Sequence, residues 1–182
     1  MVERSFGVTN LAGLGVGLGV AASVASIVES LVSQYFHPKF YAEIAKGDKR
    51  DRLVAWETFY VNALSVFMPC MFYVFCLSKS ILRILVHADY SSSFFVLSLG
   101  ALIEFFRMIT NVVYSISQSE KKTKSTIMPY GFGALTVAVG LSVIYFKNLA
   151  IDFVPWILVL AGLVAFLAMV MSMRKLQPFK IH

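Results

Sequence analysis

The stretch GALIEFFRMITNVV (residues 100–113) decides the fold, because it carries opposite charges inside an apolar run. That run extends over Tyr90–Ser119 and contains no charged residue except Glu104 and Arg107. About 20 mostly apolar residues suffice for a helix that crosses a bilayer. The run therefore predicts a transmembrane helix over residues 92–117, with an acid and a base inside the span.

Small and polar residues line one face of this predicted helix. Positions three or four apart share a face, and lipid offers polar groups no hydrogen-bond partners. The stripe is therefore expected to face protein or a water-filled cavity. It consists of Ser93, Leu97, Gly100, Glu104, Arg107, Asn111, Tyr114, Ser115 and Gln118.

The two charges within the span allow three interpretations. A charge at the bilayer centre costs about 2.5–3.5 kcal/mol on insertion scales, and the i,i+3 spacing lets Glu104 and Arg107 neutralise each other. Alternatively, Arg107 meets an anionic substrate, because a guanidinium presents a planar fork of donors that suits phosphate. In a third interpretation Glu104 binds a proton or a cation. The candidate substrate-binding residues are Arg107, Glu104, Asn111 and Tyr114, which share the stripe.

The composition of the chain favours further spans. Of 182 residues, 58% are hydrophobic and 14% charged, whereas soluble domains average about 45–50% and about 25%. We expect one all-α membrane domain over residues 1–182. Apolar stretches of sufficient length predict five spans, at about 9–34, 55–77, 92–117, 127–146 and 153–173.

The first two predicted spans carry residues that affect helix packing. Small residues let membrane helices approach closely, so two rows in the first span are expected to pack on neighbouring helices. Glu29 lies near the cytoplasmic end of this span, where water is expected to solvate it. Pro69 in the middle of the second span predicts a kink or an open carbonyl. The two rows are Gly15, Gly19, Ala22, Ser26, Glu29 and Ser33, and Gly13, Gly17 and Ala21.

Most lysines and arginines fall on one side of the membrane if the spans alternate. Basic residues in short loops mark the cytoplasmic side. The loops after the first and third spans and the C-terminus are therefore expected in the cytoplasm, with the N-terminus outside. The bases on that side are Lys39, Lys46, Lys49, Arg50, Arg52, Lys121, Lys122, Lys124, Arg174, Lys175 and Lys180.

Several classes of function lack support in the sequence. The bases cluster in loops rather than on one basic face, so no nucleic-acid partner is expected. His37, His87 and His182 lie far apart without ligand spacing, so no metal site is expected. No phosphate-binding loop or Ser-His-Asp pattern is present. We therefore expect neither enzymatic activity nor a cofactor.

Three segments resemble segments of the polysaccharide flippase family. HPKFYAEIAKGDKRD (residues 37–51) resembles a segment with proline, a small loop, Gly-Asp and bases. MPCMFYVFCLSKSILRILVHADYSSS (residues 68–93) resembles a mid-helix proline followed by a Lys-Ile-Leu segment and a tyrosine. YSISQSEKKTKSTIMPYGFGALTVAVGLSVIYF (residues 114–146) resembles the basic loop and the Gly-rich helix after it. Together the segments cover most of the chain.

The resemblance implies a role in surface polysaccharide biosynthesis. The family belongs to the multidrug/oligosaccharidyl-lipid/polysaccharide exporter superfamily, and it moves oligosaccharides such as O-antigen units on undecaprenyl pyrophosphate across the bacterial inner membrane. Its members have roughly 12–14 helices in two lobes around a cavity and work by alternating access. The chain would then correspond to most of the second lobe, with VERSFG (residues 2–7) at the end of that lobe's first helix. The implied partners are the lipid-linked oligosaccharide, membrane lipids and a separately encoded N-terminal lobe.

Two alternatives to half of a flippase stay open at this point. The chain could be a truncated, non-transporting remnant or a scaffold for polysaccharide assembly. It could also be a small exporter that works as a homo-oligomer. The exporter needs an ionisable residue placed for cation binding, and Glu104 is the candidate.

Overall fold

The protein folds into long helices joined by short connections. The computed structural model describes residues 8–46, 48–86, 93–120 and 122–176, and these ranges contain no strand. The segment at residues 2–7 lies outside the described residues. The helices, with two short 3₁₀ turns (η), are α2 (Val8–Lys46), α3 (Lys49–Leu85), α4 (Phe94–Ser119), η2 (Thr123–Thr126), α5 (Ile127–Lys147), η3 (Ile151–Phe153) and α6 (Val154–Leu176).

The prediction of five long apolar helices is confirmed. Each of the five predicted ranges coincides with a helix that is long and apolar enough to cross a membrane. The bounds of α4, α5 and α6 agree with the predicted spans to within three residues. The second predicted span is a single helix that continues past Pro69.

Helices α2 and α3 are longer than predicted, because the prediction followed apolar sequence alone. Both continue into polar sequence, where aromatic side chains pack between them. The rings of Phe40 and Phe59 stack with centroids 4.9 Å apart, and each residue is at most 3% exposed. At the start of α3, the carboxylate of Asp51 accepts a hydrogen bond from the backbone N–H of Asp48 at 3.3 Å. Packing and capping therefore extend the helices beyond the hydrophobic segments.

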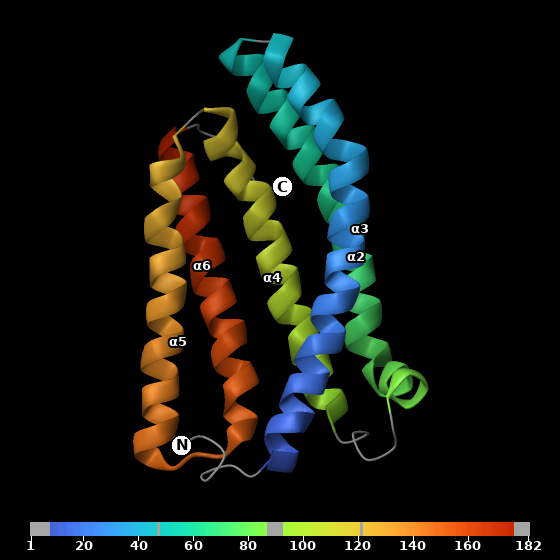
Figure 1. Cartoon of the computed structure of the whole chain (residues 1–182). Helices are drawn as coiled ribbons and strands as arrows, with labels where there is room; N and C mark the ends of the chain where they lie inside the picture. The colour runs from blue at the N-terminus through green and yellow to red at the C-terminus, as the bar shows by residue number, and fades with distance from the viewer. Residues whose placement is uncertain (1–7, 47, 87–92, 121, 177–182) are drawn as a thin grey trace.

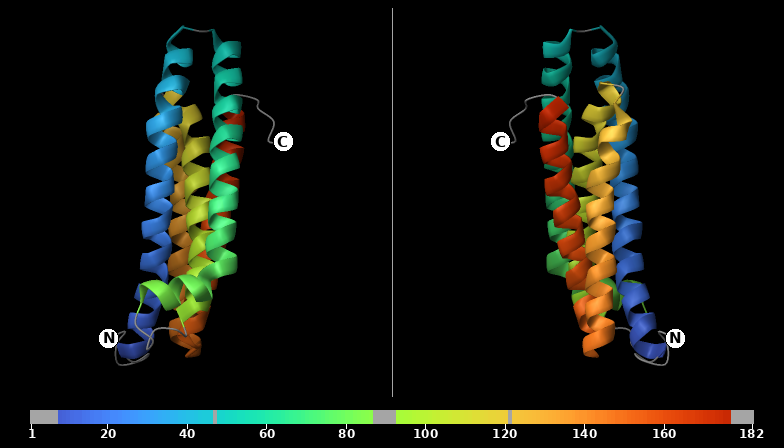
Figure 2. Two further views of the ribbon diagram at one scale, coloured as in Figure 1. Left: turned by 90° about the vertical axis from the view of Figure 1, so that its right-hand side faces the viewer. Right: turned by 90° about the vertical axis from the view of Figure 1, so that its left-hand side faces the viewer.

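Helix α4 lies between two helix pairs, α2 with α3 and α5 with α6 (Figure 1). It packs against α2, α3 and α6, whereas α5 packs mainly on α6. Figure 2 shows α2 and α5 on one side of α4, with α3 and α6 on the other. The α2–α3 connection, the α4–α5 connection and the end of α6 all lie at one end of the bundle (Figure 1).

Glycines allow α2 and α4 to touch backbone to backbone. A Cβ atom added to Gly17 would lie 2.8 Å from the Cβ of Val96 and 3.0 Å from the backbone nitrogen of Leu97. One added to Gly100 would lie 2.8 Å from the Cβ of Ala21. The prediction that the row with Gly17 and Ala21 packs on a neighbouring helix is therefore confirmed.

The other row of small residues behaves differently. A Cβ atom added to Gly15 or Gly19 would meet no atom within 4 Å in the described part of the chain. The prediction that this row packs is therefore wrong at these two positions within the chain itself. Both glycines line a hollow of about 550 Å³ on α2, which Leu85 at the end of α3 and Val86 also border.

A buried tryptophan joins α3 to α4. Trp56 is 1% exposed, and its Nε1–H donates a hydrogen bond to the carbonyl of Val112 at 3.1 Å. A buried donor or acceptor that loses its partner pays a desolvation cost. This contact therefore holds α3 against the half of α4 that carries the polar residues described below.

We expect Trp56→Phe to lower the free energy of unfolding by about 1–2 kcal/mol, because it removes the hydrogen bond and part of the buried ring. The measurement is SDS titration of the purified chain in detergent micelles, followed by circular dichroism. Trp156→Phe is the matched control, since Trp156 is 51% exposed. Equal effects of the two substitutions would show that the Trp56 contact does not stabilise the bundle.

Candidate functional site

Three helices bring polar side chains together in the part of the chain expected to lie within the bilayer. We call this group the polar face: Glu29 of α2, Glu104, Arg107 and Asn111 of α4, and Tyr130 of α5. Arg107 lies at its centre. Its Nε donates to Oε2 of Glu104 at 2.6 Å, and its Nη1 lies 2.8 Å from Oε2 of Glu29. One guanidinium therefore binds two carboxylates from two helices.

A chain of hydrogen bonds extends this group to the third helix. The Nδ2 of Asn111 donates to Oε1 of Glu29 at 2.8 Å. The hydroxyl of Tyr130 donates to Oδ1 of Asn111 at 3.2 Å. Because α5 otherwise packs mainly on α6, the Tyr130 contact is a direct link from α5 towards α2 and α4.

Helical spacing explains why three residues of α4 belong to the polar face. Glu104, Arg107 and Asn111 are three and four residues apart, so they share a face of the helix. The outer part of the predicted stripe is occupied by packing instead. Ser93 and Leu97 are buried, and Gly100 contacts α2. Only the part from Glu104 towards the end of α4 contributes to the polar face.

The polar face is partly open and carries unequal charge. The side chain of Arg107 is 42% exposed, that of Glu29 26% and that of Glu104 14%. Two carboxylates and one guanidinium give a formal charge of −1 when all are ionised. Lipid cannot solvate such a group, so the exposed part of Arg107 requires water, a ligand or another protein chain.

Tyr114, the fourth predicted site residue, lies beside the polar face in a small pocket. The pocket has a volume of about 170 Å³ and is lined by residues of α2, α3 and α4. Near it, the hydroxyl of Tyr41 donates to Oε1 of Gln118 at 2.7 Å. The polar residues that line the pocket are Glu29, Ser33, His37, Asn111, Tyr114, Ser115 and Gln118.

The structure brings Glu104, Arg107 and Asn111 into the polar face, with Tyr114 beside it, and adds Glu29 and Tyr130. Arg107 pairs with Glu104, which agrees with the first of the three sequence interpretations. It also binds Glu29, so the expectation that water alone solvates Glu29 is wrong. Glu29 is an acid in a row of small residues, which was a usable signal. No sequence signal pointed to Tyr130, because its contact with Asn111 depends on how α5 lies beside α4.

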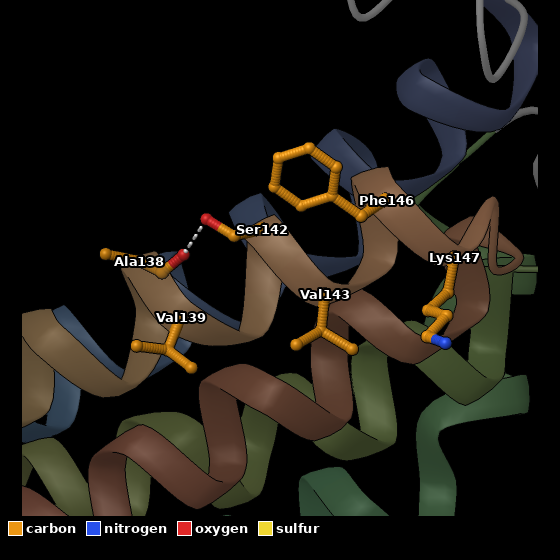
Figure 3. A pocket seen from close by; sticks show the side chains of 6 residues that line it. All are labelled: Ala138, Val139, Ser142, Val143, Phe146 and Lys147. Atoms are coloured by element: carbon orange, nitrogen blue, oxygen red, sulfur yellow. Dashed lines mark hydrogen bonds between the residues drawn. The ribbon is translucent and has the colours of Figure 1, made fainter.

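A hollow on α5 offers no converging chemistry. Figure 3 shows it on the surface of α5, with every lining residue on that one helix. The hydroxyl of Ser142 is bound to the carbonyl of Ala138 at 2.7 Å. No group of three or more His, Cys, Asp or Glu side chains suited to a metal ion occurs in the described residues. The hollow is lined by Ala138, Val139, Ser142, Val143, Phe146 and Lys147.

Comparisons with known proteins do not place the chain in a family. No protein-family model matches it, and neither a curated protein nor a solved structure matches it.

Proposed function

We propose that this chain is a transport component of the bacterial inner membrane, half of a flippase that moves undecaprenyl-pyrophosphate-linked oligosaccharide for O-antigen or capsule biosynthesis. The observation that carries a transport role is the polar face. An arginine held by two carboxylates, 42% exposed, lies in the middle of a helix apolar enough to span a membrane. Ionisable residues at such positions mark substrate or ion pathways. The substrate class rests on the resemblance of the three sequence segments.

The geometry suggests how substrate binding would be coupled to motion. A diphosphate that approaches Arg107 competes with the carboxylates of Glu29 and Glu104. Glu104 is on the same helix as Arg107, but Glu29 is on α2. If the substrate displaces Glu29, the ion pair between α2 and α4 opens. Anion binding would thereby weaken the contact between α2 and α4 at the polar face.

The distribution of bases supports the proposed orientation, with a cytoplasmic C-terminus. The α2–α3 connection, the α4–α5 connection and the end of α6 lie at one end of the bundle (Figure 1). Among the described residues at this end are Arg50, Lys122, Lys124, Arg174 and Lys175. Lysines and arginines favour the cytoplasmic side. The opposite wall of the transport path would come from a separately encoded N-terminal lobe.

A small cation exporter that works as a homo-oligomer is the second candidate. It is favoured by one observation, that two carboxylates surround a single guanidinium. A site with a formal charge of −1 attracts cations more readily than anions. This candidate predicts resistance to organic cations in cells that express the chain alone.

The proposed function is tested in cells that lack their own flippase. We expect surface glycan to be restored when the chain is expressed with an N-terminal lobe, and not when it is expressed alone. Arg107→Ala should reduce restoration at least about tenfold, because it removes the guanidinium that meets the diphosphate. Arg83→Ala is the matched control, since Arg83 is an exposed base at the end of α3.

Two results would contradict the proposal. Unchanged transport by Arg107→Ala would remove the substrate role of Arg107. Failure of every first-lobe partner to restore glycan would favour a non-transporting remnant or scaffold.

A further inference from the structure

A row of residues on α2 has the spacing of a helix-packing seam. Gly15, Gly19, Ala22, Ser26 and Glu29 follow each other at intervals of four, three, four and three residues. Two helices that cross at a shallow angle, about 20°, interdigitate through this pattern. At Gly15 and Gly19 no atom of the described residues lies within 4 Å of an added Cβ. Side chains of a further helix can therefore fit over these two glycines, in the hollow of about 550 Å³ that they line together with Leu85 and Val86.

The charge at the end of this seam selects the kind of helix. Glu29 belongs to the polar face, where it shares Arg107 with Glu104. The excess of one carboxylate is costly inside a bilayer unless a positive charge balances it. A second copy of this chain would bring the same excess charge to a symmetric contact. A helix with a basic residue would instead complement it.

We propose that the seam and the polar face dock a transmembrane helix of another protein that presents one lysine or arginine to Glu29 and Glu104. Such a base would share the carboxylates with Arg107 and leave its guanidinium freer for other ligands. In the proposed transporter, which this inference deepens, the helix belongs to the protein that supplies the opposite wall. The docking surface itself is tested below without any transport assay, so the two proposals fail separately.

The experiment measures association with synthetic membrane peptides. The chain is labelled with a donor fluorophore at Cys76, which is exposed, after Cys70→Ala, and reconstituted in phosphatidylcholine vesicles. The peptides are Leu-Ala helices about 24 residues long, labelled with an acceptor, with either one lysine or one alanine at the centre. We expect energy transfer to report about tenfold tighter association of the lysine peptide, because a polar pair in lipid strengthens helix association.

Two variants separate the charge from the seam. Glu29→Gln combined with Glu104→Gln should abolish the preference for lysine. The control is Glu43→Gln, which should leave the preference unchanged, because Glu43 is exposed and lies outside the polar face. Gly15→Leu with Gly19→Leu should weaken binding of the lysine peptide. Neither added Cβ meets an atom of the described residues within 4 Å, and SDS titration followed by circular dichroism checks that the substituted bundle keeps its fold.

Three outcomes would overturn the inference. One is equal binding of the lysine and alanine peptides to the unmodified chain. Another is a lysine preference that survives the double glutamine substitution. The third is energy transfer between donor- and acceptor-labelled copies of the chain that excludes the peptide, which would assign the surface to self-association.

Discussion

Arg107→Met is expected to lower the free energy of unfolding by about 2–3 kcal/mol. The substitution keeps an unbranched apolar stem but removes the positive charge that binds Glu29 and Glu104. Both carboxylates then lose their shared cation in a medium that solvates them poorly. The expected loss of stability is smaller than for a fully buried ion pair, because the Arg107 side chain is 42% exposed.

Two compensating substitutions test whether the charge imbalance causes this loss of stability. Adding Glu29→Gln and Glu104→Gln to Arg107→Met should recover at least half of the lost stability, because neutral amides need no counter-charge. SDS titration followed by circular dichroism measures all variants, with Arg83→Met as the control in an exposed base. If the triple variant is no more stable than Arg107→Met, the charge imbalance is not the cause of the loss.

Gly17→Ala is expected to destabilise the bundle by about 1–3 kcal/mol, because overpacking forces the backbone apart. The added methyl group would lie 2.8 Å from Val96 and 3.0 Å from the backbone nitrogen of Leu97. A backbone atom cannot turn away as a side chain can, so α2 and α4 must separate. The same titration measures the change in the free energy of unfolding.

Gly15→Ala, two residues earlier on the same helix, is the matched control. Its methyl group meets nothing within 4 Å in the described residues, and alanine favours helix over glycine by about 0.5–1 kcal/mol. We therefore expect no loss, or a small gain, in stability. Similar losses from both substitutions would show that the close α2–α4 contact at Gly17 does not govern the stability of the bundle.

The number and positions of the helices were predictable because apolar runs fix where a chain can cross a membrane. The ends of α2 and α3 were not, because the additional turns are stabilised by tertiary contacts. The stacking of Phe40 on Phe59 joins residues 19 positions apart and has no periodic signal. Likewise, the sequence showed that Gly15 and Gly17 belong to two rows, but not which row would meet α4.

The part of the candidate site on α4 was predictable from helical spacing alone. Glu104, Arg107 and Asn111 share a face in any helix. Their partners Glu29 and Tyr130 depend on which helices flank α4, and that is a property of the assembled bundle. The sequence of α4 alone therefore predicts a neutral pair of Arg107 and Glu104. In the structure Arg107 also binds a second acid, Glu29.

The lengths of α2 and α3 have a mechanical consequence. Their 39 and 37 residues correspond to rods of about 55–60 Å at about 1.5 Å per residue, roughly twice the hydrocarbon thickness. The tip of this hairpin extends beyond the end of α4 (Figure 1). When α2 tilts about its contact with α4, the tip near Asp48 sweeps a wider arc than Glu29. A spectroscopic label at the tip would therefore report a rearrangement of the ion pair as a larger displacement than a label beside Glu29.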